Sequence, residues 1–148
     1  MVKSKVSLLD FAYFHQKSGN LSDAREQYEL AILLSPGTPQ LHYWFGKFLL
    51  HQEENVDEAV AHFEMANKLD PESLDVALSL ARGYMFKHEF DRAKAIIDSI
   101  SEAIDEAEDN LKKIFLDTDV QIHYRRADDF CRSGDFSNAL VSLESMRD

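Results

Sequence analysis

Apolar residues along the chain recur at steps of three and four, which is the spacing of a helix with one buried stripe. The same short pattern occurs four times. In each copy an alanine is followed four residues later by a bulky apolar residue and seven residues later by a small or apolar one. The four alanines are Ala24, Ala59, Ala93 and Ala139. The first three lie 35 and 34 residues apart and the fourth follows after 46. A period near 34 residues indicates an array of helical repeats.

Each copy divides into two helices joined by a turn. The turn segments are rich in residues that break helices, and they lie at 18–20, 54–55, 87–89 and 133–135. The residues predicted to cap or begin the second helices are Asn20, Asn55, Asp91 and Asp135. Pro36 and Pro71 close the first two copies. One such helix pair cannot bury its apolar stripe alone, so we expect the pairs to stack, each contacting only its neighbours.

A small residue behind a larger one completes each copy, at Phe11-Ala12, Phe45-Gly46, Leu80-Ala81 and Arg126-Ala127. Together these positions resemble the tetratricopeptide repeat, a helix-turn-helix unit. The clearest copy consists of Leu8, Phe11, Ala12, His15, Gly19, Leu21, Ala24, Tyr28, Ala31 and Pro36. The second copy has one extra residue in its turn, around Glu53-Glu54, and the fourth is the weakest because Arg126 replaces an apolar residue. The resemblance covers nearly the whole chain except an insert at about 106–118.

The resemblance implies an all-α fold, a right-handed α-solenoid of stacked antiparallel helix pairs that form a superhelix. We predict one domain over residues 1–148, since 148 residues that are 45% hydrophobic are enough for a single core. The four predicted repeats span about 5–38, 39–73, 74–107 and 120–148.

The insert continues the apolar period of the third repeat without a proline or glycine. We therefore predict one long helix from about 91 to 116, with an acidic outer face, and a new helix after it capped by Asp117 or Thr118. One hypothesis is a projecting helix that docks a partner or a second copy. The favoured interpretation is a longer helix that covers the weak fourth repeat.

The net charge of −11 argues against nucleic-acid binding, because phosphate recognition needs clustered lysine and arginine. No apolar run of membrane-spanning length is present. The first residues lack the apolar segment of a secretion signal, and the single cysteine excludes an intramolecular disulfide. These features predict a cytoplasmic protein with no membrane association.

Nothing in the sequence indicates an enzyme. There is no phosphate-binding loop and no dinucleotide-binding glycine motif, so no cofactor is expected. The six histidines are scattered, and no metal site is expected. Cys131 is predicted to be a buried or half-buried structural thiol, and Trp44 to pack between helices.

In tetratricopeptide proteins the first helices of the repeats line a concave groove that binds an extended peptide or a helix of a partner. The resemblance places an aromatic and basic strip in that groove, formed by Tyr13, Tyr43, Lys47, Arg82, Phe86 and Tyr124. Such a strip suits an apolar peptide that carries one or two acids. The carboxylate clamp of some co-chaperones in the family is predicted to be absent. The positions of this chain that correspond to the clamp are occupied by Leu9, Tyr13, Lys47, Asp75 and Ser79, and only one of these residues is basic.

The predicted function is a protein-protein interaction scaffold that belongs to a larger multidomain protein. The alternatives are a small secretion or assembly chaperone and the non-catalytic arm of a signalling ATPase or another enzyme. The last helix is expected to expose Leu140, Leu143 and Met146. A further hypothesis is a homodimer that forms through this C-terminal face or through the extended helix.

Overall fold

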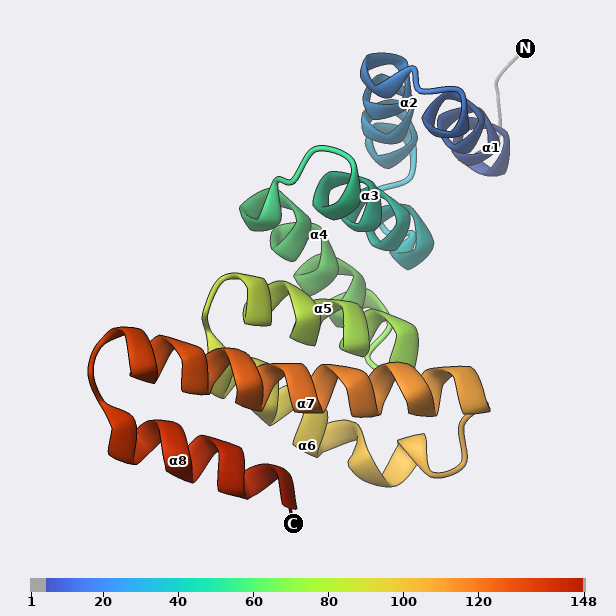
Figure 1. Ribbon diagram of the computed structural model, residues 1–148. Helices are drawn as coiled ribbons and strands as arrows, with labels where there is room; N and C mark the ends of the chain where they lie inside the picture. The colour runs from blue at the N-terminus through green and yellow to red at the C-terminus, as the bar shows by residue number, and fades with distance from the viewer. Residues whose placement is uncertain (1–4, 148) are drawn as a thin grey trace. The chain divides into compact units, whose positions relative to one another are not determined.

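The computed structural model describes residues 5–147 and, within them, contains eight α-helices and one 3-10 turn with no strand. The helices are α1 (Lys5–Lys17), α2 (Leu21–Leu34), α3 (Pro39–His51), α4 (Val56–Leu69), α5 (Leu74–Phe86), α6 (Phe90–Ile104), α7 (Asp109–Arg132) and α8 (Phe136–Glu144). The 3-10 turn η1 (Ser145–Arg147) follows α8. The helices pair in sequence order, as Figure 1 shows, and they form two compact units, Met1–Ser73 and Leu74–Asp148.

Unit 1 contains two helix pairs, α1 with α2 and α3 with α4, and α2 also packs on α3. Its core is aromatic. The ring of Tyr28 on α2 stacks on Phe45 of α3 at 5.5 Å and lies 5.3 Å from Phe48. Gly46 lets α4 approach closely, because a Cβ at this position would lie 2.7 Å from the ring of Phe63. The small residue predicted at this crossing is therefore required by a specific neighbour.

Unit 2 pairs α5 with α6 and α7 with α8, and α7 also packs on both α5 and α6. Its core residues on the second helices of the pairs include Ala93, Ile97 and Ala139, at the positions that the repeat pattern marks as buried. Helix α7 is the longest helix, with 24 residues, and its buried side chains include Ile122, His123 and Ala127.

The four turns that join the two helices of each pair share one backbone feature. A residue with positive φ stands two positions before each second helix: Gly19 at 80°, Glu54 at 53°, His88 at 62° and Gly134 at 81°. Such a left-handed residue ends a helix by letting the next backbone N–H bond back to an unpaired carbonyl. In the second turn the N–H of Asn55 reaches Leu49, six residues back, whereas Asn20 reaches His15, five back. This difference accounts for the extra residue seen in the sequence.

The caps are partly as predicted. The side chain of Asn55 accepts from the N–H of Glu58, and the side chain of Asp135 accepts from the N–H of Asn138. Asn20 occupies an N-cap position without such a bond. Asp91 lies in the first turn of α6, whose N-cap is Glu89.

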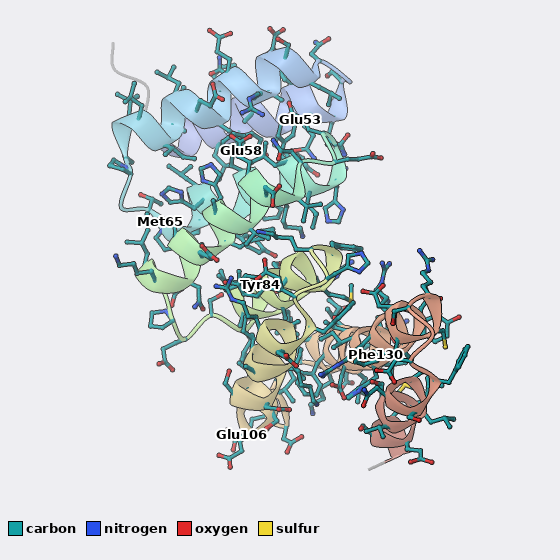
Figure 2. All side chains as sticks on the ribbon, turned by 90° about the vertical axis from the view of Figure 1, so that its left-hand side faces the viewer. Glu53, Glu58, Met65, Tyr84, Glu106 and Phe130 are labelled. Atoms are coloured by element: carbon teal, nitrogen blue, oxygen red, sulfur yellow. The ribbon has the colours of Figure 1, made fainter. Side chains whose placement is uncertain are left out.

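The prediction of one helix from about 91 to 116 is wrong. Helix α6 ends at Ile104, and residues 105–108 form a turn in which the N–H of Ala107 donates to the carbonyl of Ile104 at 3.0 Å. Glu106 lies in this turn (Figure 2). The apolar period continues across it, but the acids that surround it oppose the negative end of a helix dipole. The same charge favours a helix beginning at Asp109.

The inserted residues therefore lengthen the first helix of the fourth pair rather than the second helix of the third. That pair begins at Asp109, not near 120. Asp117 and Thr118 cap nothing, since both lie inside α7 and Thr118 is buried. The first three predicted repeats, 5–38, 39–73 and 74–107, each contain one observed helix pair.

Candidate functional site

The side of unit 1 that is formed by α1 and α3 is hollowed. A cavity of about 310 Å³ is lined by Leu9, Asp10, Tyr13, Tyr28 and Trp44. A second cavity of about 270 Å³ is lined by Tyr13, Gln16, Lys17, Trp44, Lys47, Phe48 and His51. Tyr13 and Trp44 line both, so the two cavities adjoin each other at these side chains. We call the residues of these two sets the α1–α3 groove.

Charge is distributed unevenly along the α1–α3 groove. Asp10 lines only the first cavity, whereas Lys17 and Lys47 line only the second. The ammonium of Lys17 lies 5.3 Å from the centre of the Tyr13 ring, and that of Lys47 lies 5.2 Å from the Trp44 ring. These are cation–π distances, at which the rings hold the ammonium groups over the surface. A chain of net charge −11 thus presents two cations beside two aromatic side chains.

Tyr28 forms part of the floor of the groove. Its ring is buried, and its hydroxyl donates to Oε1 of Gln16 at 3.1 Å. Burial raises the pKa of Tyr28 to about 12, so the phenol stays neutral at physiological pH. Behind it stand Phe45 and Phe48, which fix the spacing of α2 and α3. The groove therefore rests on the packed aromatic core of unit 1.

An ion cluster holds α2 to the following helix pair. Arg25 on α2 donates to Glu58 of α4 at 2.7 and 3.0 Å, to Glu53 in the α3–α4 turn and to Glu29 on its own helix at 2.9 Å. Figure 2 labels Glu53 and Glu58. The guanidinium also lies 5.7 Å from the centre of the Phe45 ring. The hydrogen bond with Glu58 raises the pKa of Arg25, so this arginine is permanently charged.

The predicted strip residues of unit 1 are brought together. Tyr13 and Lys47 both line the groove, and the ammonium of Lys47 lies 5.3 Å from the ring centre of Tyr43 as well. Tyr43 packs in turn against Trp44, with ring centres 5.2 Å apart. Trp44, which was expected to pack between helices, is 39% exposed and lines both cavities. Trp44 is the groove residue that the sequence analysis missed. Its position two residues before Gly46 gave no signal of exposure.

The predicted residues of unit 2 are placed less clearly. Arg82 and Phe86 are half-buried on α5, and Tyr124 is exposed on α7. The guanidinium of Arg125 lies 5.0 Å from the centre of the Phe86 ring, so an intramolecular cation already covers that side chain. It stays a prediction that a binding surface includes Arg82, Phe86 and Tyr124.

A different depression, of about 230 Å³, lies in unit 2 between the α5–α6 turn and α7. It is lined by His88, Phe90, Asp91, Arg126, Asp129 and Phe130. His88 Nδ1 lies 2.6 Å from Oδ2 of Asp129, and Arg126 is 3.0 Å from Asp91. The arginine that weakened the fourth repeat pattern is thus explained, because it bridges α7 to α6 instead of packing as an apolar residue.

Two histidines of unit 1, His42 and His62, contact each other. His42 is buried; its Nε2 donates to the carbonyl of Pro36 at 2.7 Å and its Nδ1 lies 3.1 Å from Nδ1 of His62. Burial, and then the nearby His42, lower the pKa of His62. Cys131 is exposed, not buried or half-buried as predicted, and it lies in the last turn of α7.

Over residues 5–147, no group of three or more histidine, cysteine, aspartate or glutamate side chains is arranged to hold a metal ion. None of the helices in this part of the chain is long and apolar enough to cross a membrane.

One known family resembles part of these helix pairs. Residues 50–114 match the tetratricopeptide repeat family. The matched segment contains α4, α5 and α6, with the end of α3 and the beginning of α7. No match is found among curated proteins.

Solved structures agree on the fold. MamA MSR-1 C2 aligns with a TM-score of 0.65 at 20% identity over 98% of this chain and 76% of that one. A crystal structure of MamA gives 0.65 at 18% identity, over 96% and 75%. A tetratricopeptide repeat protein from Parabacteroides merdae ATCC 43184 gives 0.64 at 15% identity, over 98% of this chain and 65% of that one. The predicted all-α tetratricopeptide-type fold is confirmed. At these identities the likeness concerns the fold alone.

Proposed function

We propose that this protein is a protein-protein interaction scaffold and that the α1–α3 groove binds an extended peptide segment of a partner. Tetratricopeptide folds serve in general as interaction scaffolds, which supports the class. The observation that carries the proposal is the pairing of Tyr13 and Trp44 with Lys17 and Lys47 in one hollow of an acidic chain. Exposed aromatic side chains with adjacent cations are typical of residues that dominate binding energy.

The chemistry of the groove specifies the peptide. The space between Tyr13 and Trp44 suits an aromatic or branched aliphatic side chain, which would be desolvated between two rings. A carboxylate next to that side chain would reach Lys17 and Lys47, where charge-assisted hydrogen bonds form. Asp10 stands on the other side of Tyr13 and disfavours a second acid there. The ligand is therefore an apolar anchor followed by an acid, in one direction along the groove.

Trp44 provides a direct assay, because it is the single tryptophan of the chain. Short random peptides displayed on phage are selected on the purified protein, and binding of the selected peptides is measured by Trp44 fluorescence. We expect enrichment of an aromatic or aliphatic residue beside Asp or Glu. The variant Lys17→Glu/Lys47→Glu is expected to lose about tenfold or more in affinity for these peptides, because attraction becomes repulsion.

The same variant also tests specificity by inversion. A fresh selection on Lys17→Glu/Lys47→Glu should enrich Lys or Arg beside the anchor. Lys68→Glu is the matched control, since Lys68 is an exposed lysine on α4 outside the groove. Peptides that bind both variants as tightly as the unmodified protein, or that leave Trp44 fluorescence unchanged, would exclude this groove as the site.

A further inference from the structure

The second cavity of the α1–α3 groove contains cations without acids. Lys17 and Lys47 line it, and neither lysine is ion-paired with a carboxylate in the part of the chain that the structure describes. In the depression of unit 2, by contrast, Arg126 lies 3.0 Å from Asp91. The cavity of unit 1 therefore holds positive charge that no side chain of its own lining neutralises.

Gln16 adds a hydrogen-bond donor to the same cavity. Its amide oxygen accepts from the hydroxyl of Tyr28 at 3.1 Å, so its amide nitrogen is the group that remains to donate to a ligand. Gln16, Lys17 and Lys47 thus present nitrogen donors to one space of about 270 Å³. A carboxylate has two oxygens for such donors, whereas a phosphoryl group has three and a charge of about −1.5 to −2 at neutral pH.

The walls beside these donors are aromatic. Tyr13, Trp44 and Phe48 line the cavity. The ammonium of Lys17 lies 5.3 Å from the ring centre of Tyr13, and that of Lys47 lies 5.2 Å from the ring centre of Trp44. A ligand ring that enters between Tyr13 and Trp44 therefore brings an anionic group on that ring to the two cations.

We propose that the second cavity binds a phosphotyrosine side chain of the partner segment. The inference rests on the proposed function, because it places the apolar anchor and the acid of that peptide on one side chain. The ring of the ligand is desolvated between Tyr13 and Trp44. The phosphoryl oxygens accept from Gln16, Lys17 and Lys47. The lining comes from both α1 and α3, so the cavity is formed within unit 1.

Oriented peptide libraries test this assignment on the full chain. They share randomised flanks and differ at one central residue, which is phosphotyrosine, tyrosine, phosphoserine or glutamate. Binding is measured by Trp44 fluorescence. We expect the phosphotyrosine library to bind about tenfold tighter than the others, because it alone supplies both a ring and a phosphoryl group. Phenyl phosphate should compete with it more strongly than inorganic phosphate, which has no ring.

Two substitutions in the cavity remove donors without disturbing the floor of the groove. In Gln16→Glu the new carboxylate still accepts from Tyr28 but repels the phosphoryl group. Gln16→Glu and Lys47→Gln should each lose about tenfold in affinity for the phosphotyrosine library. Lys68→Gln is the matched control, since Lys68 lies on α4 outside the groove. Thermal unfolding verifies that each variant is folded.

The outcomes separate this inference from the function on which it rests. A phosphotyrosine library that binds no tighter than the tyrosine or glutamate library would overturn the inference and leave a groove that binds carboxylates. Equal binding of the phosphoserine library would exclude the aromatic walls from recognition and overturn the assignment to phosphotyrosine. Unchanged affinity of Gln16→Glu and Lys47→Gln would place the phosphoryl group elsewhere. Failure of the proposed function is a different result, in which the peptides selected on phage leave Trp44 fluorescence unchanged.

Discussion

The joint between α2 and α3 in unit 1 and the joint between α6 and α7 in unit 2 use the same repeat positions with different chemistry. The residue after the central alanine is a cation in both, Arg25 and Lys94. Arg25 binds three carboxylates and lies over the ring of Phe45. Lys94 binds Asp98 on its own helix and Asp119 on α7, each at 2.9 Å.

The two joints differ more in the residues that lie beneath these cations. Phe45 is buried against Tyr28, whereas the equivalent residue of α7 is Arg126, which is ion-paired with Asp91 of α6. The joint of unit 1 is thus an aromatic core with a charged cover. The joint of unit 2 has two ion pairs, Lys94–Asp119 and Arg126–Asp91, beside a buried aliphatic core. The same arrangement of helices thus accommodates both kinds of joint. We therefore expect packing changes to be costly in unit 1 and charge changes to be mild in unit 2.

Truncation of the two equivalent residues gives the largest contrast. Phe45→Ala should lower the free energy of unfolding by about 3–5 kcal/mol, because it removes a buried ring and leaves a cavity. Arg126→Ala should cost about 1 kcal/mol or less, since Asp91 is exposed and its ion pair is solvated. Urea denaturation followed by circular dichroism measures both. Equal costs at the two positions would contradict the division into an aromatic and an ionic joint.

A smaller effect is expected at Gly46. The other three repeats have alanine at this position, Ala12, Ala81 and Ala127, so the repeat pattern alone would accept Gly46→Ala. The added Cβ would lie 2.7 Å from the ring of Phe63, and overpacking of this kind costs about 1–3 kcal/mol.

Gly37→Ala is the control for Gly46→Ala, because a Cβ at Gly37 meets nothing within 4 Å. Thermal unfolding compares the two variants. A Gly46→Ala protein as stable as the Gly37→Ala protein would mean that Phe63 moves aside without cost.

These positions also show how much the sequence could predict. The helix pairs and their turns were predictable, because alanines, small crossing residues and turn residues recur at fixed spacing. The break at 105–108 was not, because no proline or glycine marks it and the apolar period runs through. The acids on both sides of the break, such as Glu102 and Asp109, were the available signal. The prediction of one continuous helix followed the apolar period and gave these acids no weight.

The groove was predictable only in part. Tyr13 and Lys47 follow the small residues Ala12 and Gly46, and the resemblance to the tetratricopeptide repeat implies that this position faces the groove. The exposure of Trp44 depends on what α1 leaves uncovered, and the burial of Phe86 under Arg125 depends on a residue of another repeat. Contacts between repeats are set by side-chain shape, which a periodic pattern does not contain.

Removing the equivalent cations tests the charged layer of the two joints. Arg25→Met is expected to cost about 1 kcal/mol and Lys94→Met about half of that, because Arg25 bonds more carboxylates through its planar fork and both side chains are partly solvated. Stability at low and at high salt is compared, and the difference between the variants should shrink as salt screens the pairs. A Lys94→Met protein that is the less stable of the two would reverse the assignment.

The smallest expected effect is a dependence on pH in unit 1. His42 and His123 occupy the same repeat position, but His42 faces the neutral ring of His62, whereas Nε2 of His123 lies 3.7 Å from the carboxylate of Asp119. The charged and titratable groups around His62 are His42 on α3, Glu58 on α4, and Arg25 and Glu29 on α2. Burial lowers the pKa of His62 below its ordinary value, so the unfolded chain binds a proton more readily than the folded chain does.

Stability conferred by the neutral His62 is therefore complete above the ordinary histidine pKa and is lost as the pH falls below it. The urea midpoint should decrease between about pH 7.5 and about pH 5.5, on either side of the unperturbed value. His62→Phe keeps a ring against His42 and Phe45 but does not titrate, so its midpoint should decrease less over the same interval. If the variant and the unmodified protein lose the same stability, the pH dependence arises from other histidines and the His42–His62 contact adds nothing to the difference between the two joints.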